Sequence, residues 1–431
     1  MNTRKICLWA APVLVVALAV AAYFFFFKSR PQIVELSDGT KLTLLGVTYG
    51  KHHVSPVPKG APKSVRPQRM DTAEETLCVW MQEQRKGNNY PNYEVLAYDS
   101  ANTACVGSWT RTYGNNRGGN NIAGVSFDAF PRRGKKVILR FAEYGRNGQE
   151  VAKGEFVVSN PARGKTFSSW SPESLPITQS DGDLDVTLTR LAIDRNNMFN
   201  SNGQDDKDAK TDPRNRAVLA AFRATQNGSP ATNWQPVSVI TSDATGNHTG
   251  MRSWSNRHEN DEEVMTYQWG LWSDEPAWKL RVEFSRTSGF NSDELWTVSE
   301  IPFVKGDINN MWNNRNNTNV FAETTLNDIH LQLFKAIQPS AEQARNYGNL
   351  DAVLLIRAKP MPEGWRMKLA KVTDDRGHEV QAQDWGSGGG DYRFALRNFG
   401  GSTNINITLA FHRSRYVEFT AKPQMEASRK P

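Results

Sequence analysis

The chain has 431 residues, which is too long for one ordinary hydrophobic core and indicates two to four domains of about 100–150 residues each. Hydrophobic residues make up 38% of it and aromatic residues 10%, a composition that excludes an intrinsically disordered protein. The net charge is +7, but residues 164–319 are net acidic and the segments on both sides are net basic. A nucleic-acid-binding protein usually gathers Lys and Arg in one stripe, so we expect no nucleic-acid partner.

The first thirty residues predict a membrane anchor. Ile6 to Phe27 form a run of 22 residues without a charge, with Arg4 and Lys5 before it and Lys28 and Arg30 after it. A helix of this length crosses a hydrocarbon core of about 30 Å. The alternative is a cleaved signal peptide, because Ala-Val-Ala at 19–21 resembles a cleavage site. Cleavage there would leave an apolar mature N-terminus, so we expect residues 1–30 to be an uncleaved single-pass anchor, with the body outside the cytoplasm.

Residues 31–163 are expected to form a first β-sandwich domain. Apolar and polar residues alternate here in segments rich in β-branched side chains, which is the pattern of half-buried strands. These segments are 40–50, 76–83, 136–144 and 154–159. Cys78 and Cys105 lie in this domain, and in an exported protein they could form a disulfide. His52 and His53 follow the first hairpin. A zinc site needs three or four converging ligands, so we expect these two histidines to be surface residues rather than zinc ligands.

Residues 164–305 are expected to form a second β-sandwich domain. Its alternating segments are 184–193, 217–225, 278–286 and 294–299. The stretch 212–225 could also begin as a helix, with Asp212 as cap and Pro213 in the first turn, but its similarity to 352–359 favours a strand. His258 precedes several acids and is expected to be a solvated surface residue.

The second domain contains two candidate ligand sites. Its insert at 194–212 has oxygen-bearing side chains that could bind calcium, although their spacing does not match an EF-hand, and a surface loop is the alternative. These residues are Asn200, Asn202, Asp205, Asp206 and Asp208. Trp269 and Trp272 are the second candidate. They lie three positions apart, so on an extended strand they would point to opposite faces, and Trp272 is expected to be exposed for stacking on a sugar.

Residues 306–321 are rich in Asn and are expected to link the second domain to a third β-sandwich domain at 322–431. The alternating segments of the third domain are 329–337, 352–359, 404–412 and 415–420. Ser340–Asn346 is predicted to be a short helix inserted between two strands. The glycine-rich stretch Gly386–Asp391 precedes a strand rather than a helix, so it is expected to be a hairpin and not a phosphate loop.

An aromatic–Asp–Trp pattern recurs once in each predicted domain. The Asp follows the first aromatic residue by nine positions and precedes the Trp by ten or eleven. The three sets are Tyr90, Asp99 and Trp109; Trp234, Asp243 and Trp254; and Trp365, Asp374 and Trp385. Around Asp243 the residues Thr245, Asn247 and His248 could form a small-ligand site. A position that recurs beside different neighbours is more typical of a shared turn, in which Asp accepts backbone N–H bonds.

The segments 271–298 ("LWSDEPAWKLRVEFSRTSGFNSDELWTV") and 411–423 ("FHRSRYVEFTAKP") resemble a group of uncharacterised bacterial membrane-anchored proteins built of several β-sandwiches. The resemblance implies a fold class and an exported location, and it implies no activity and no catalytic residue. Each predicted domain is also similar in outline to immunoglobulin-like and fibronectin-III-like sandwiches.

The sequence therefore predicts a mainly β protein with an N-terminal transmembrane helix and three tandem β-sandwich domains. It contains no G-x-S-x-G elbow, no H-E-x-x-H or C-x-x-C spacing and no nucleotide-binding fingerprint. We expect a non-enzymatic cell-envelope protein without a cofactor, which acts as a spacer or recognition module toward another envelope protein or a glycan. The alternative is a carbohydrate-binding or carbohydrate-processing surface protein that uses Trp269 and Trp272.

Overall fold

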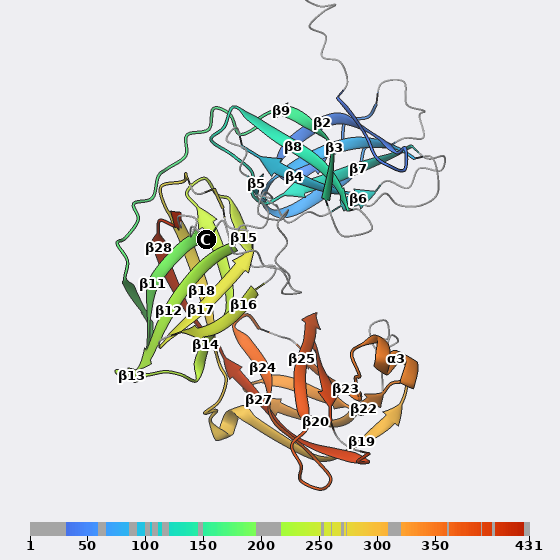
Figure 1. Ribbon diagram of the computed structural model, residues 1–431, viewed down its shortest axis with the longest axis vertical. Helices are drawn as coiled ribbons and strands as arrows, with labels where there is room; N and C mark the ends of the chain where they lie inside the picture. Colours follow the sequence, from blue (N-terminus) through green and yellow to red (C-terminus); the bar gives the residue numbers. More distant parts are fainter. Residues whose placement is uncertain are drawn as a thin grey trace, which may run out of the picture.

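The computed structural model describes most of the chain between residues 32 and 425. The segments outside the description within this range are 59–65, 86–92, 100–103, 106–110, 114–119, 145–149, 195–216, 251–253, 260, 269–270, 273, 309–319, 360–361, 389 and 399–400. The described residues are mainly β, and α3 (Ala341–Asn346) is the one α-helix that lies wholly within them. Figure 1 shows three groups of strands arranged one after another along the long axis of the molecule.

The first group consists of two sheets, which we call the first sheet pair. One sheet has the order β1 (Ile33–Glu35), β2 (Lys41–Val54), β3 (Arg69–Gln84), β7 (Asn120–Phe127) and β6 (Arg111–Tyr113). The other has the order β5 (Ala104–Cys105), β4 (Glu94–Tyr98), β8 (Lys136–Tyr144) and β9 (Glu150–Ser159). Neighbouring strands in both sheets are antiparallel.

The second sheet pair repeats this order. One sheet runs β10 (Ile177–Asp181), β11 (Leu184–Asp194), β12 (Ala217–Gln226), β17 (Glu262–Gln268) and β16 (Trp254–Glu259). The short strands β13 (Ser229–Pro230) and β29 (Gln424–Met425) pair with β12 and β11. The other sheet runs β15 (His248–Gly250), β14 (Trp234–Asp243), β18 (Trp278–Arg286) and β28 (Arg415–Ala421).

The third sheet pair has the same two halves, which here are joined along one edge. The first half runs β20 (Val320–Leu326), β21 (Ile329–Phe334), β23 (Ala352–Lys359), β26 (Asp391–Arg397) and β25 (Gln381–Gly388). The second half runs β24 (Trp365–Asp374), β27 (Asn404–Arg413) and β19 (Leu295–Lys305), preceded by the 3-10 turn η3 (Ser292–Glu294). Strand β22 (Ala336–Gln338) joins the halves because it pairs with β23 and with β19.

The last strands of the second and third sheet pairs come from unexpected parts of the chain. In the first sheet pair, β8 pairs with β9, the strand that follows it. In the second, β18 pairs with β28 from the end of the chain, and in the third, β27 pairs with β19, which follows β18. The expectation that each domain is one contiguous segment therefore differs from the pairing observed. The third sheet pair is inserted between two neighbouring strands of the second.

Alternating side chains explain why these segments form two facing layers. In β18 the buried Leu280, Val282 and Phe284 alternate with outward residues. In β11 the buried positions shift from Leu188 to Leu191, because a bulge between 188 and 190 resets the register against β12. Phe222 of β12 lies edge-to-face with Phe284 at 5.6 Å between ring centroids, so the two sheets of the second pair enclose one core.

The hydrophobic core is continuous between the first and second sheet pairs. One cluster of buried residues extends from Val34 to Val158 in the first pair and from Ile177 to Ala421 in the second. The third sheet pair has a core of its own, which includes Leu354, Leu409 and Phe411. The first two pairs are therefore joined by apolar packing, whereas the core of the third pair is separate from that of the second.

The short helix predicted from Ser340 to Asn346 is confirmed as α3. Ser340 is its N-cap, and the hydroxyl oxygen accepts a hydrogen bond from the backbone N–H of Gln343 at 3.3 Å. The predicted membrane span Ile6–Phe27 lies outside the described residues. Within the described ranges, no helix combines the length and the apolar character that crossing a membrane requires.

Candidate functional site

The Asp243 segment is a turn held by the Asp243 carboxylate. Its Oδ1 accepts hydrogen bonds from the backbone N–H of Thr245 at 2.8 Å and of Asn247 at 3.2 Å, and Oδ2 accepts from the Asn247 side chain at 2.9 Å. Asp243 is buried, and its own backbone N–H donates to the carbonyl of Asn247. Both carboxylate oxygens therefore serve the chain reversal rather than a ligand.

Asp374 holds a turn of the same construction in the third sheet pair. Its Oδ1 accepts from the backbone N–H of Arg376 at 2.9 Å and of His378 at 2.7 Å, the same two offsets as in the Asp243 turn. In both turns the third residue after the Asp is a glycine with positive φ, Gly246 at 90° and Gly377 at 84°. The residues after Asp99 lie outside the described part of the chain, so the third copy of the turn stays a prediction.

The Asp243 turn also joins the first sheet pair to the second. Arg132, which precedes β8, donates from Nε to the Asn247 Oδ1 at 2.8 Å and from Nη1 to the Thr245 carbonyl at 3.1 Å. The backbone N–H of Phe130 donates to the same Asn247 oxygen at 3.1 Å. Only 4% of Arg132 is exposed, so this guanidinium is buried between the two sheet pairs.

Arg132 is equally well held on its own side of this junction. Its Nη2 donates to the Glu75 carbonyl at 2.8 Å, and Nη1 donates to the Tyr49 hydroxyl at 3.2 Å. The Tyr49 hydroxyl donates to Glu75 at 2.6 Å, and this bond lowers the pKa of the Glu75 carboxyl. Burial lowers the pKa of Arg132, but an arginine starts so high that it keeps its charge. The junction is therefore a satisfied network around one buried cation.

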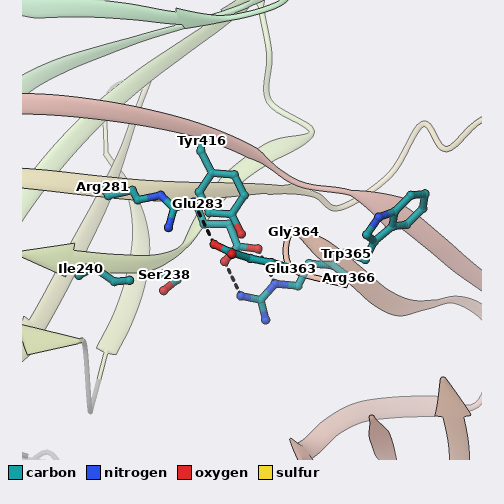
Figure 2. Close-up of a pocket in the computed structure, with 9 residues that line it drawn as sticks. All are labelled: Ser238, Ile240, Arg281, Glu283, Glu363, Gly364, Trp365, Arg366 and Tyr416. Carbon is teal, nitrogen blue, oxygen red and sulfur yellow. Dashed lines mark hydrogen bonds and ion pairs between the residues drawn. The ribbon is translucent and has the colours of Figure 1, made fainter. Parts of the chain in front are cut away.

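A pocket of about 270 Å³ lies at the junction between the second and third sheet pairs. It is lined by Ser238, Ile240, Arg281, Glu283, Glu363, Gly364, Trp365, Arg366 and Tyr416. Its floor is the outer face of β14, β18 and β28, and its roof is the turn that leads into β24. Figure 2 shows Glu283 between Tyr416 and Arg366, with the Trp365 indole directed away from this group.

Glu283 and Arg366 form the fixed ion pair of the pocket. Arg366 donates from Nε at 2.7 Å and from Nη2 at 2.5 Å, one bond to each carboxylate oxygen. The Glu283 side chain is 7% exposed, and burial raises its pKa, but the hydrogen bonds and charge of Arg366 outweigh burial and lower the pKa below its usual value. This bidentate pair connects β18 of the second sheet pair to β24 of the third.

Arg281 and Glu363 form a looser ion pair at the mouth of the pocket. Arg281 Nη2 donates to Glu363 Oε1 at 3.0 Å, and the two side chains are 41% and 74% exposed. The Arg281 guanidinium also lies 4.5 Å from the centre of the Tyr416 ring, so it is oriented by a cation–π contact. The pocket thus has one bidentate ion pair with a buried glutamate and one exposed ion pair held by a single hydrogen bond.

A serine and a histidine meet next to this junction without forming a catalytic pair. Ser285 Oγ lies 3.0 Å from His412 Nε2, but His412 Nδ1 is buried and has no hydrogen-bond partner among the described residues. Burial, together with the charges of the nearby arginines and Lys368, lowers the pKa of His412 to about 4. A catalytic base is ordinarily oriented by a third group and has a pKa near neutral, and His412 shows neither feature among the described residues.

The expectation that Trp272 is exposed is wrong. Trp272 is 4% exposed and packs in the core shared with Trp278, whose indole N–H donates to the Trp272 carbonyl at 3.0 Å. The strand argument fails because Trp272 lies in a turn, where its carbonyl also accepts from the Glu275 N–H. Trp269 lies outside the described residues, so its exposure stays a prediction.

The structure does not test the predicted calcium site. The five calcium candidates Asn200, Asn202, Asp205, Asp206 and Asp208 lie outside the described residues. Within the described ranges, no three His, Cys, Asp or Glu residues are grouped so that they could hold a metal ion.

The predicted disulfide also receives no support. Cys78 is a buried free thiol in β3, and Cys105 lies on β5 in the opposite sheet, with its side chain outside the described part. His53 is buried and bonded to Thr48 and Thr76 rather than exposed as expected, whereas His258 is exposed beside Glu263.

Sequence reasoning missed the junction pocket, because its walls come from strands that are distant in the chain. One local pattern pointed to it: charged residues occupy the outward positions of the predicted strand 278–286, at Arg281 and Glu283. Which segment covers that face depends on the pairing of β28 with β18, which no local pattern encodes.

Comparisons with known proteins add little. No protein-family model matches the chain, and no curated protein matches it. Three chains of solved structures match. One is described as the crystal structure of the conserved domain protein from Bacillus anthracis, with 12% sequence identity, a TM-score of 0.21, and coverage of 63% of this chain and 81% of that chain.

Proposed function

We propose that this protein is a non-enzymatic cell-envelope protein that holds a recognition surface at a fixed distance from a membrane. A helix at Ile6–Phe27 would anchor it, and three β-sandwiches of immunoglobulin or fibronectin-III outline would project outward from the anchor. The apolar N-terminal run supports the anchor, and the two sheet-pair junctions support the role of a stiff spacer.

The observation that carries the spacer role is the pairing of β28 with β18 and of β19 with β27. The chain crosses between the second and third sheet pairs twice, once through residues 287–294 and once through the single residue Ser414 between β27 and β28. Two crossings restrict bending about either one. A tandem protein with one linker at each boundary is free to bend there, so a double crossing favours a fixed geometry.

The first junction adds stiffness by a different route. The segment between β9 and β10 lies along the second sheet pair, because the Glu173 N–H donates to the Thr420 carbonyl at 2.8 Å and Lys279 lies 5.2 Å from the centre of the Trp170 ring. Arg133 bridges to the buried Glu275 at 2.9 Å. Together with Arg132 and the continuous core, these contacts oppose rotation of the first sheet pair about the second.

Two measurements on the full-length protein test this function. After expression in a bacterium, the protein should sediment with membranes, and a variant with Leu14→Asp and Leu18→Asp should not. Protease added outside intact spheroplasts should digest the body. Recovery of the unaltered protein in the soluble fraction would contradict the anchor.

Stiffness is tested by spin labels at the exposed Glu155 in the first sheet pair and Glu323 in the third. Cys7 and Cys105 are replaced by Ser so that they are not labelled. Pulsed electron–electron double resonance should then give one narrow distribution of distances between the two labels. A broad or multiple distribution would contradict the spacer role. The carbohydrate alternative loses its best-supported residue, because the buried Trp272 presents no face to a sugar.

A further inference from the structure

We propose that the junction pocket is a binding site for a small ligand that carries one carboxylate, and that Arg281 holds this group. The inference starts from the exposed ion pair at the mouth of the pocket. Glu363 is 74% exposed and makes one hydrogen bond to Arg281, at 3.0 Å. An exposed pair of this kind is worth only about 0.2–1 kcal/mol, so a ligand carboxylate can replace the Glu363 side chain.

The second arginine of the pocket is not available in the same way. Arg366 is committed to Glu283 by two parallel hydrogen bonds, and Glu283 is buried with a firmly ionised carboxyl. Separating this pair would leave a buried charge without its partner, which is costly. The exchangeable cation is therefore Arg281, and a single carboxylate is the charge that restores neutrality when the Glu363 side chain moves away.

Arg281 is already placed to receive a carboxylate. It extends from the centre of β18, which is paired with β14 on one side and β28 on the other, so its backbone is fixed. The contact with the Tyr416 ring holds the guanidinium plane. Arginine has five N–H donors arranged as a fork, and one atom of this fork contacts Glu363, which leaves an edge for a bidentate bond.

The pocket also limits the size and character of the ligand. Its volume of about 270 Å³ is just below the range of about 300–1,000 Å³ typical of sites for drug-sized molecules, so one ring or one short side chain fits. The floor offers the apolar Ile240, which is 41% exposed, beside the hydroxyl of Ser238. A compact body with an apolar face and one carboxylate matches this lining, as in a hexuronic acid or an acidic amino-acid side chain.

The two sources share one chemistry and are separated by the choice of probe. D-glucuronate represents the acidic sugar, the α-amide of N-acetyl-L-glutamate, whose one carboxylate is that of the side chain, represents the acidic side chain, and D-glucose is the uncharged control. Each is titrated into the full-length protein in a polyoxyethylene detergent, and binding is followed by saturation-transfer difference NMR. The inference is independent of the anchor and the spacer role, because neither affects binding in this assay.

Three variants make the assay decisive. Arg281→Gln should weaken binding by at least about tenfold, since it removes a charge-assisted bidentate contact. Glu363→Ala should strengthen binding by roughly 1.5- to 5-fold, since it removes the competing carboxylate. Lys279→Gln is the matched control, because Lys279 is an outward cation of the same strand with its own exposed pair to Glu418, and it should change binding less than twofold.

The outcomes separate clearly. Binding of either acidic probe, with opposite effects of the Arg281 and Glu363 variants, supports the site, and the tighter probe identifies the source. The proposal is overturned if neither acidic probe binds, if D-glucose binds as tightly, if Glu363→Ala weakens binding, or if Arg281→Gln leaves it unchanged. Far-ultraviolet circular dichroism checks that each variant is folded, and Glu363→Ala remains a valid test if Arg281→Gln fails to fold.

Discussion

Arg132 and Asn247 are 115 positions apart in the chain, and the Arg132 Nε donates to the Asn247 Oδ1 at 2.8 Å across the boundary between the first two sheet pairs. The same oxygen accepts from the Phe130 N–H, and Asn247 in turn donates to Asp243. The turn that recurs along the sequence is thus also the contact surface for the preceding sheet pair. The Asp243 turn therefore both reverses the chain and joins the first sheet pair to the second.

Replacing Arg132 by Met should lower the free energy of unfolding by about 2–5 kcal/mol, because the carbonyls of Thr245 and Glu75 lose the Arg132 donor at this buried junction. Urea denaturation followed by tryptophan fluorescence measures the loss. Lys41→Met is the control: Lys41 is an exposed cation of the same sheet pair, paired with the exposed Glu35 at 3.7 Å, and its loss should cost less than about 1 kcal/mol. Equal losses in the two variants would contradict the role of Arg132.

Replacing Asp243 by Ala should cost about 1–3 kcal/mol, because the backbone N–H groups of Thr245 and Asn247 lose a charged acceptor in a buried turn. Asp243→Asn keeps one acceptor oxygen and should lose less. Asp374→Ala should also destabilise the protein, since its turn is built in the same way. Thermal unfolding of the three variants tests whether the two carboxylates stabilise their turns in the same way. An Asp243→Ala variant as stable as the wild type would contradict this role of Asp243.

Stability should fall as the pH is lowered from about 6.5 to 4, in part because of His412. The folded pKa of His412 is about 4 and the unfolded value is about 6.5. In this window the unfolded chain binds a proton that the folded protein does not, so the free energy of unfolding decreases by at most about 3 kcal/mol. His412→Gln should lose this part of the pH dependence. Urea titrations at pH 7.5 and 4.5 measure it, and identical pH dependence in both proteins would contradict it.

Cys78 should resist thiol reagents in the native protein. Burial raises its pKa to about 12, and the thiolate is the reactive form. A maleimide added without reductant should label Cys78 only after the protein is unfolded in guanidinium, as judged by peptide mass mapping. Labelling that requires both unfolding and a reductant would instead indicate a bond to Cys105.

Local patterns predicted individual strands well. The segments 136–144 and 278–286 coincide with β8 and β18, because alternation of apolar and polar residues reports on burial within one strand. The turns at Asp243 and Asp374 were predicted from the recurring spacing of an aromatic residue, an Asp and a Trp. These features depend only on residues close in the chain.

Features that depend on distant residues were not predicted. The alternation in 415–420 shows that this segment is a strand, but it is equally compatible with pairing to β27 or to β18. Trp272 was placed on the surface by a strand rule that does not hold in a turn, where the Trp278 indole binds its carbonyl. The junction pocket was not predicted because it forms only where β28 lies beside β18, and these strands are distant in the chain.

The pairing of β28 with β18 is tested most directly by a cysteine pair at Lys279→Cys and Thr420→Cys. These positions are direct neighbours across the two strands and point outward. Side chains so placed lie about 4.5–5.5 Å apart at Cβ, close enough for a disulfide after a small adjustment. Mild oxidation of the full-length protein, followed by non-reducing electrophoresis and peptide mapping, should give a monomer with residues 279 and 420 bonded. A protein that forms no such bond, or forms it only between two chains, would show that the third sheet pair is not inserted into the second within one molecule.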